Sequence, residues 1–312
     1  MMSAAPSPAS PFRIGSRGSP LALAQANLAA AALRAAHGWA EDAIRIVPVT
    51  TSGDRIQNRA LAEIGGKALW TKELDRALLA GEIDCAVHSM KDVETVRPES
   101  IHVAAMLPRA AVEDRLIGAP SIAALPHGAI IGTSSPRRAA QLKALRPDLT
   151  TTLLRGNVAR RLAAVEAGEI AATLLAAAGL DRLGMADTGA TIPAETMLPA
   201  VSQGAVGIEC RADDSAATAL LAAIDHAPTT RCVRAERALL LALGGTCHSP
   251  IAALAREQGA DIHLRAQILN EDGSEQVGDE ALLPGGALDG AAALGARLLG
   301  RASPALRALF TP

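Results

Sequence analysis

Residues 13–38, RIGSRGSPLALAQANLAAAALRAAHG, predict a short strand, a turn and a helix. Ser19 is a typical N-cap residue, and Pro20 suits the first helical position because proline has no backbone N–H to satisfy. Gly38 is placed to end the helix in a left-handed conformation. Apolar residues at helical spacing predict a buried stripe of Leu21, Ala24, Leu28, Ala31 and Ala35.

The same order of elements returns later in the chain. Residues 130–147, IIGTSSPRRAAQLKALRP, again indicate a strand, a helix start at Ser135 and Pro136, and a stop. In a second matching pair, residues 71–89 and 158–176 each run from a helix through Ala-Gly-Glu-Ile into an apolar strand. This internal repeat predicts two related α/β lobes.

Short apolar strands that alternate with helices predict mostly parallel sheets, which bind ligands at the carboxyl ends of their strands. We expect a cleft between the two lobes. The third region differs, because a predicted helix over residues 231–243 precedes three strand-like segments and a closing helix. The predicted fold class is therefore α/β in two lobes, with a small C-terminal α+β domain. The predicted boundaries are a disordered tail at 1–12, lobe 1 at 13–105 and 205–223, lobe 2 at 106–204, and the α+β domain at 224–312.

The composition is that of a globular protein and excludes several classes. Of 312 residues, 49% are hydrophobic and 20% are charged, and a net charge of −2 provides no basic field for nucleic acid. The four cysteines are scattered singly, which argues against a disulfide framework or a zinc ribbon and fits a reducing cytoplasm. The longest uncharged run, 238–255, is broken by glycine and proline, so it does not predict a membrane span. The opening residues do not resemble a signal or transit peptide. We expect a cytoplasmic protein without nucleic-acid or membrane partners.

Arginines mark the predicted ligand-binding edge. Arg137 and Arg138 fall in the first turn of a helix, where the macrodipole disfavours a cation by about 0.3–1 kcal/mol. An anion bound at that helix N-terminus would reverse the effect. We therefore expect a ligand with several carboxylates or phosphates, gripped by arginine side chains that lie outside the core. Further arginines near strand ends and helix starts are Arg17, Arg155, Arg161 and Arg182.

Asp92 and Cys247 are the candidates for chemistry. Asp92 follows a predicted strand and, taken alone, is more typical of a cap or of a partner for Lys91. Beside a cationic edge, its carboxylate could stabilise positive charge on a substrate and carry a proton. Cys247 stands on a glycine turn, GGTCHSP at 244–250, although a free cysteine is most often a small buried hydrophobe.

Seven ordered segments resemble the signatures of the porphobilinogen deaminases, also called hydroxymethylbilane synthases. The segments are IGSRGSPLALAQA, GGKALWTKEL, DCAVHSMKDV, IGTSSPRRAAQL, LLRGNVARRL, LAAAGLDRLG and LPAVSQGAVGIECR. The resemblance continues through ERALLLALGGTCHSPIA and so covers nearly the whole chain. It implies a transferase that joins four porphobilinogen molecules into the linear tetrapyrrole hydroxymethylbilane, with release of ammonia, in haem biosynthesis. It also implies lobes similar to the paired domains of periplasmic binding proteins.

The resemblance implies a role for each matching residue. The family holds a dipyrromethane cofactor through a thioether to one cysteine, and Cys247 matches that position. Asp92 matches the catalytic aspartate, and Gln203 falls in a matching segment near the connection between lobes. Residues that match cofactor-binding positions are Arg17, Ser19, Lys91, Arg137, Arg138 and Arg155. Residues that match substrate-binding positions are Arg17, Lys67, Arg155, Arg161 and Arg182. No metal is implied, and we expect a monomer.

Two other functional classes fit part of the sequence. An exported two-lobed solute-binding protein would explain the repeat and the arginines, but we expect no leader here, and Cys247 would have no role. A Cys/His hydrolase would explain Cys247 followed by His248, yet side chains adjacent in sequence seldom face each other as a nucleophile and base must. A phosphate or nucleotide enzyme is disfavoured, because neither the P-loop nor the dinucleotide glycine pattern is present.

Overall fold

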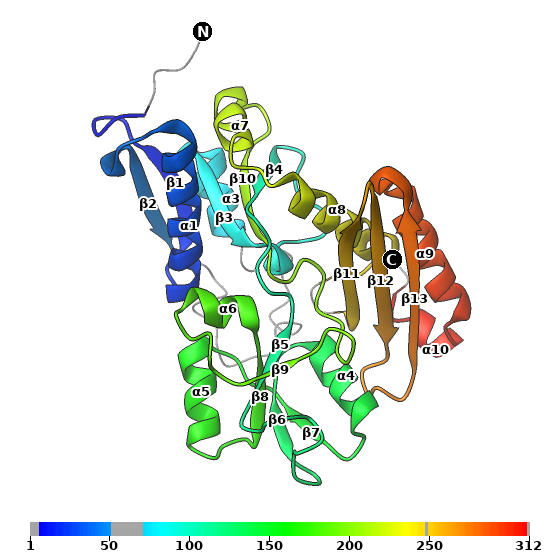
Figure 1. Ribbon diagram of the computed structural model, residues 1–312. Coiled ribbons are helices and arrows are strands. Elements are labelled where there is room, and N and C mark those ends of the chain that lie inside the picture. Colours follow the sequence, from blue (N-terminus) through cyan, green and yellow to red (C-terminus); the bar gives the residue numbers. More distant parts are fainter. Residues whose placement is uncertain (1–5, 51–70, 247–248, 311–312) are drawn as a thin grey trace. The chain divides into compact units, whose positions relative to one another are not determined.

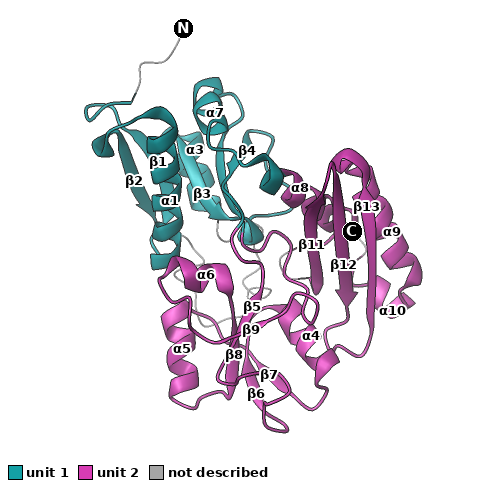
Figure 2. Cartoon of the chain, viewed as in Figure 1, with its two compact units in different colours: residues 1–56, 66–109, 205–230 teal, residues 57–65, 110–204, 231–312 magenta. Residues whose placement is uncertain are grey.

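The computed structural model describes residues 6–50, 71–246 and 249–310 (Figure 1). These residues form two compact units, which Figure 2 shows in different colours. Unit 1 holds the described residues of 1–56, 66–109 and 205–230, and unit 2 holds those of 110–204 and 231–312. Unit 1 is therefore completed by a segment that follows residues 110–204 in the sequence.

Unit 1 is built on a five-stranded sheet with the strand order β2-β1-β3-β10-β4. Its elements are β1 (Phe12–Arg17), α1 (Pro20–His37), η1 (Glu41–Ala43), β2 (Ile44–Val49), α3 (Lys72–Leu79), β3 (Cys85–Ser89), η2 (Met90–Asp92), β4 (Ile101–Met106), β10 (Val206–Arg211) and α7 (Ser215–Ala222). β1 pairs in parallel with β2 and β3, whereas β10 is antiparallel to β3 and β4. Apolar residues of α1 pack with Ile14 of β1 and Ile208 of β10 to form the core.

Unit 2 begins with a second five-stranded sheet, in the order β7-β6-β8-β5-β9. Its elements are β5 (Asp114–Ile117), β6 (Ile130–Gly132), α4 (Pro136–Leu145), β7 (Thr150–Thr152), α5 (Val158–Glu166), β8 (Ala172–Ala176), α6 (Ala177–Arg182) and β9 (Ala190–Ile192). β6 pairs in parallel with β7 and β8, and β5 is antiparallel to β8 and β9. The core of this sheet includes Leu116, Ile131 and Leu174.

The two sheets have the same topology, which confirms the predicted internal repeat. In each sheet three parallel strands are followed by an antiparallel fourth strand, β10 in unit 1 and β5 in unit 2. Ser19 and Ser135 both cap the helix that follows, each accepting a hydrogen bond from a backbone N–H three residues ahead. Gly81 and Gly168, in the two Ala-Gly-Glu-Ile turns, have φ angles of 68° and 70°, where glycine is favoured over residues with a Cβ. The local sequence signals are thus realised in both copies.

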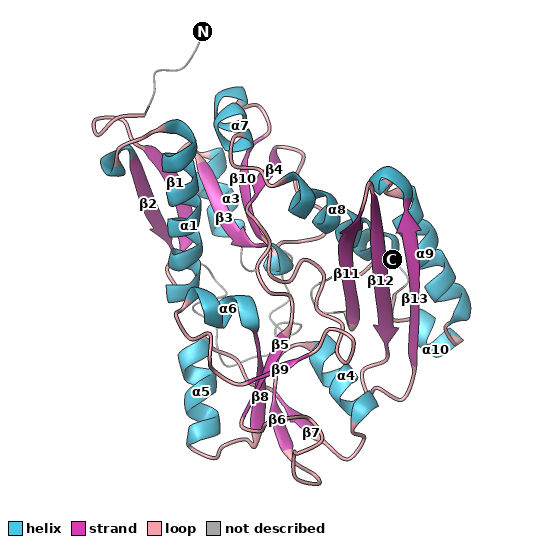
Figure 3. Ribbon diagram, viewed as in Figure 1, coloured by secondary structure: helices cyan, strands magenta, loops and turns pink. Residues whose placement is uncertain are grey.

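The C-terminal region is an antiparallel sheet with helices packed against it (Figure 3), which confirms the predicted α+β architecture. Its elements are α8 (Ala227–Ala242), β11 (Ile251–Gln258), β12 (Asp261–Leu269), β13 (Gln276–Leu283), η3 (Pro284–Gly286), α9 (Asp289–Arg301) and α10 (Pro304–Arg307). Leu239 of α8, Leu264 of β12 and Leu294 of α9 share one core. The sheet belongs to unit 2, where Gly273 lies so close to α4 that a Cβ would be 2.4 Å from the Ala140 carbonyl oxygen.

Two expectations at the N-terminus are wrong. The buried residues of α1 are Ala22, Gln25, Ala26, Ala29, Ala30 and Leu33, whereas Leu28 is 45% exposed. In a helix so rich in alanine the apolar pattern has little contrast, so the sequence does not fix which face is buried. The tail is also shorter than predicted, because Phe12 starts β1 and packs against Trp39, and Ser7 forms a backbone bridge with Ser10.

The remaining domain boundaries stay predictions, as does the cleft expected between the lobes. Within the described helices, none is both long and apolar enough to cross a membrane.

Candidate active site

Several predicted residues gather at one edge of the unit 1 sheet. β1 and β3 are parallel neighbours, so their carboxyl ends meet at that edge. Arg17 ends β1 and Ser19 caps α1, while Lys91 and Asp92 lie in η2 directly after β3. Gln25 Nε2 of α1 donates a hydrogen bond of 2.7 Å to Ser89 Oγ at the end of β3. Lys67 lies outside the described residues.

Asp92 has an unengaged carboxylate. Its side chain is half-buried, and no hydrogen bond or ion pair reaches it from the described part of the chain. Neighbouring carboxylates differ, because Glu94 accepts from Thr71 and Arg97, and Glu209 accepts twice from Arg97. Asp92 is therefore available to a ligand where the surrounding acids are not.

Arg137 and Arg138 are buried, which corrects the expectation that they lie outside the core. Their exposed fractions are 3% and 6%. Arg137 Nη2 donates to Asp114 Oδ2 at 2.8 Å, and Arg138 Nη2 donates to Asp114 Oδ1 at 2.7 Å. Asp114 begins the antiparallel strand β5, so it lies at the edge where the parallel strand β8 ends. The chain itself thus supplies an anion at the start of α4.

The Arg137–Asp114–Arg138 cluster keeps one net positive charge, because two guanidinium groups share one carboxylate. Burial would raise the pKa of Asp114, but the charges and hydrogen bonds of both arginines outweigh it and hold that pKa far below its usual range. Burial lowers the pKa of Arg137 despite the attraction to Asp114. The Nε–H groups of Arg137 and Arg138 are buried and have no hydrogen-bond partner among the described residues. The cluster therefore keeps one uncompensated positive charge together with two buried donors that no described residue engages.

Arg155, Arg161 and Arg182 also lie on segments that follow the parallel strands of unit 2: after β7, in α5 and at the end of α6. Arg161 Nη2 donates to a serine hydroxyl at 3.2 Å, and Arg182 Nη2 donates to a backbone carbonyl at 2.7 Å. Burial lowers the pKa of Arg155, and it lowers that of Arg182 even with Asp181 nearby. Cations that have lost part of their hydration gain most from an anionic ligand.

Cys247 lies outside the described residues, but both flanks of its turn are described. Gly244 and Gly245 donate backbone hydrogen bonds of 2.9 Å to the last turn of α8, which ends it in a Schellman motif. Thr246 N donates to Ser249 Oγ at 3.1 Å, and Ser249 N donates to Thr246 O at 3.1 Å. The adjacent glycines therefore end the helix immediately before the cysteine.

Asp114 is the main site residue that sequence reasoning missed. The only sequence signal was a carboxylate at the start of an apolar strand, EDRLI, because its arginine partners lie 23 and 24 residues away. Gln203, placed only near the lobe connection from sequence, donates from Nε2 to Asp114 Oδ1 at 2.8 Å. A second cluster around Arg97 in unit 1 was also missed. No group of three His, Cys, Asp or Glu side chains in the described ranges is arranged to hold a metal ion.

Two family profiles match the chain. Residues 12–219 match "Porphobilinogen deaminase, dipyromethane cofactor binding domain", and residues 230–302 match "Porphobilinogen deaminase, C-terminal domain". The chain is 62% identical over 309 residues to the porphobilinogen deaminase of Sphingopyxis alaskensis, covering 97% of this chain and 98% of that protein. It is 52% identical over 295 residues to the porphobilinogen deaminase of Paracoccus denitrificans, covering 93% of each.

Similar solved structures include a periplasmic substrate-binding protein of an ABC transporter from Coxiella burnetii. That similarity has a TM-score of 0.44 at 15% identity and covers 70% of this chain and 93% of the other. The BvgS periplasmic VFT2 domain of Bordetella pertussis is similar with a TM-score of 0.39 at 13% identity, covering 68% of this chain and 86% of that one. The assignment rests on the sequence relatives, whose matches span nearly the full chain. The chain belongs to the porphobilinogen deaminase family, the hydroxymethylbilane synthases of tetrapyrrole biosynthesis.

Proposed function

We propose that the chain carries out the family reaction with Asp92 as its catalytic residue and Cys247 as the covalent anchor of a dipyrromethane cofactor. The reaction joins four porphobilinogen molecules into hydroxymethylbilane and releases ammonia at each addition. When bound, the dipyrromethane supplies the primer to which the first substrate ring is joined. The chain's own residues bind the carboxylates of the cofactor and substrate, stabilise positive charge on the substrate and move protons.

The described residues fit a cofactor and substrate that carry acetate and propionate groups. Arg137 and Arg138 share a net positive charge and have two Nε–H donors without a partner among the described residues. Arg155 and Arg182 are cations whose burial disfavours their charge. A hydrogen bond from each to a ligand carboxylate would contribute about 1.5–3 kcal/mol. The binding roles of Arg17, Ser19, Lys67, Lys91 and Arg161 rest on the family match.

Burial disfavours the other three cysteines as the anchor. Cys85, Cys210 and Cys232 are all buried. Burial raises the pKa of the Cys85 and Cys210 thiols, which disfavours the nucleophilic thiolate. Cys247 instead follows a glycine turn at the end of α8.

The unengaged carboxylate of Asp92 is the observation that carries the catalytic proposal. Loss of ammonia from porphobilinogen leaves positive charge on a methylene pyrrole, and a fixed carboxylate stabilises that charge more than water would. A carboxylate that no described residue engages can also accept a hydrogen bond from a pyrrole N–H and move a proton. The role requires both the negative charge and its position.

Two substitutions separate charge from position at Asp92. Asp92→Asn keeps the size and removes the charge, so we expect turnover to be almost eliminated. Asp92→Glu keeps the charge but moves it by one methylene, so we expect slow turnover with partly built chains still attached to the enzyme. Product formation and the masses of covalent intermediates report both effects. Glu99→Gln serves as the control, because Glu99 is an exposed carboxylate between η2 and β4. Equal turnover in the Asn and Glu variants would reduce Asp92 to a structural residue.

We also infer that the enzyme acts as a monomer in the cytoplasm. Single scattered cysteines fit a reducing compartment, and the repeated lobes provide a ligand edge within one chain. Sedimentation velocity of the purified enzyme tests the monomer, and a concentration-dependent dimer would rule it out.

A further inference from the structure

The buried guanidinium of Arg97 lies among carboxylates from three segments of unit 1. Arg97 Nη2 donates to Asp75 Oδ1 of α3 at 2.6 Å, and Nη1 donates to Glu94 Oε2 in the loop after η2 at 2.7 Å. Nε and Nη2 also donate to the two carboxylate oxygens of Glu209 on β10, both at 2.8 Å. The Arg97 side chain is 9% exposed and that of Glu209 is fully buried. One guanidinium therefore joins α3, the loop and β10.

Glu209 contacts the same chain segment on both sides of Asp92. His88, on β3 before η2, brings Nε2 to 3.2 Å from Glu209 Oε2, although without the alignment of a formed hydrogen bond. Arg97, beyond η2, makes the bidentate contact with the same carboxylate. Both ends of the segment 88–97 thus meet at one buried acid, and Asp92 lies between them.

A second connection fixes the loop to α3. Thr71 Oγ1 donates to both carboxylate oxygens of Glu94, at 3.0 and 2.9 Å, and accepts from Arg97 Nη1 at 3.3 Å. Thr71 is the N-cap residue of α3, yet its hydroxyl makes no capping bond because it is directed to Glu94. Thr71 and Arg97 therefore both hold Glu94, and with it the loop after η2.

The charges of this cluster depend on Arg97. Three carboxylates, those of Asp75, Glu94 and Glu209, surround the single guanidinium of Arg97. Because the cluster is largely buried, the carboxylates would repel one another strongly if the cation were absent. Burial opposes the charge of Arg97, but the hydrogen bonds and charges of Asp75 and Glu209 outweigh it and raise the pKa of Arg97. Without this cation, repulsion from Glu209 and Asp75 would push Glu94 and its loop away.

We propose that Arg97 is a positioning residue that holds the Asp92 turn in its reactive place by fastening the following loop to β10 and α3. This inference rests on the proposed catalytic role of Asp92. Displacing a reacting group by about 1 Å costs on the order of 100-fold in rate. Loss of Arg97 should therefore reduce the rate of each addition, while the carboxylate-binding arginines of unit 2 remain intact.

The test compares variants of the cofactor-loaded enzyme by steady-state kinetics and by the masses of covalent intermediates. In Arg97→Met we expect kcat to fall on the order of 10- to 100-fold with KM little changed. Arg97→Lys should recover part of kcat, because an ammonium keeps the charge but cannot make the bidentate contact. Arg13→Met is the control. Arg13 makes a bidentate pair with Asp84 at the amino-terminal ends of the parallel strands β1 and β3, whereas Asp92 follows the carboxyl end of β3. This variant should leave kcat unchanged.

Several results would overturn the proposal. They are a folded Arg97→Met enzyme with kcat within about twofold of the parent, a rise in KM at unchanged kcat, or an equal fall of kcat in Arg13→Met. If Arg97→Met does not fold, Glu94→Gln takes its place, since it weakens the contacts of the loop with Arg97 and Thr71 and leaves the Arg97–Glu209 pair in place. Unchanged kcat in that variant counts against the proposal. Full activity in Asp92→Asn would instead remove the role of Asp92. An inactive Asp92→Asn beside a fully active Arg97→Met would overturn only the inference about Arg97.

Discussion

Asp114→Asn tests the buried cluster of unit 2. The carboxylate lies between Arg137 and Arg138 and also accepts from Gln203. Asparagine fits the same space but removes the charge, so the cluster changes from one net positive charge to two. Its amide nitrogen would also face a guanidinium donor. Both arginines would stay buried without a counterion.

The structure indicates a large effect on stability. Removing one partner of a buried ion pair costs about 3–5 kcal/mol, because an uncompensated charge remains inside. Since the whole protein is expected to be stable by only about 5–15 kcal/mol, this is a substantial fraction. Adding Arg138→Leu to Asp114→Asn should recover part of the lost stability. The double variant again has a net charge of +1, and Arg137 no longer has a second buried cation beside it.

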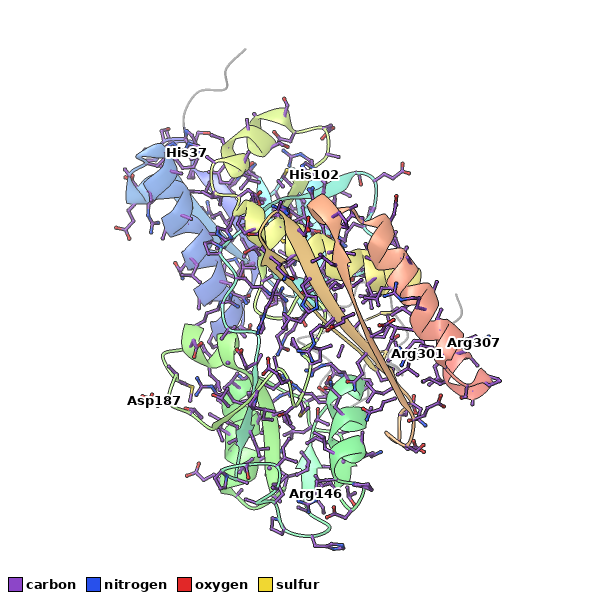
Figure 4. All side chains as sticks on the ribbon, turned by 45° about the vertical axis from the view of Figure 1, so that its right-hand side comes forward. His37, His102, Arg146, Asp187, Arg301 and Arg307 are labelled. Carbon is purple, nitrogen blue, oxygen red and sulfur yellow. The ribbon has the colours of Figure 1, made fainter. Side chains whose placement is uncertain are left out.

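Urea unfolding followed by circular dichroism measures the effect, as a lower midpoint for the transition that includes unit 2. The matched control is Asp148→Asn. Asp148 makes a bidentate pair with Arg146 at the end of α4, and Figure 4 labels Arg146 at the periphery. The Arg146 and Asp148 side chains are 23% and 19% exposed, whereas that of Asp114 is fully buried, so this control should shift the midpoint less. If Asp114→Asn cost no more than Asp148→Asn, the cluster would not be the buried charge balance described here.

Three further predictions concern other sites. Ser202 has a φ of 64° and a buried hydroxyl without a partner among the described residues, so Ser202→Gly should stabilise the protein by on the order of 1 kcal/mol in urea unfolding, and a loss would show that the hydroxyl is needed. The pKa of Glu209 is lowered from 4.5 to about 2, because His88 and Arg97 outweigh burial, so its contribution is complete above pH 4.5 and is lost as the pH falls toward 2. Glu209→Gln should remove that part of the acid dependence, and an unchanged profile between these pH values would assign it to other groups. Arg182→Leu should raise KM for porphobilinogen about 10- to 100-fold, with partial recovery in Arg182→Lys, and an unchanged KM would exclude carboxylate binding there.

Local signals made much of the fold predictable. Ser19 and Ser135 cap the helices that the sequence predicted, and the turn glycines Gly81 and Gly168 have the left-handed conformation that ends each helix. The three strand-like segments between two predicted helices likewise predicted the C-terminal sheet. The buried face of α1 was not predictable, because alanine on every side removes the periodic contrast.

The candidate site divides in the same way. Asp92 could be placed at a strand end from its own neighbours in the sequence. The burial of Arg137 and Arg138 could not, because it depends on Asp114, which reaches the site on an antiparallel strand inserted from outside the repeat. Glu209 likewise arrives on β10, 112 residues after its ion-pair partner Arg97. Contacts that depend on inserted strands leave no local pattern.

The covalent anchor at Cys247 is tested most directly by the intact mass of the purified enzyme, followed by peptide mapping. We expect the mass of the chain plus one dipyrromethane, located on Cys247 and resistant to reducing agents because a thioether does not exchange with thiols. Cys247→Ser should give the mass of the bare chain in a folded protein. An unmodified parent enzyme, or an adduct on Cys85, Cys210 or Cys232, would show that Cys247 is not the anchor.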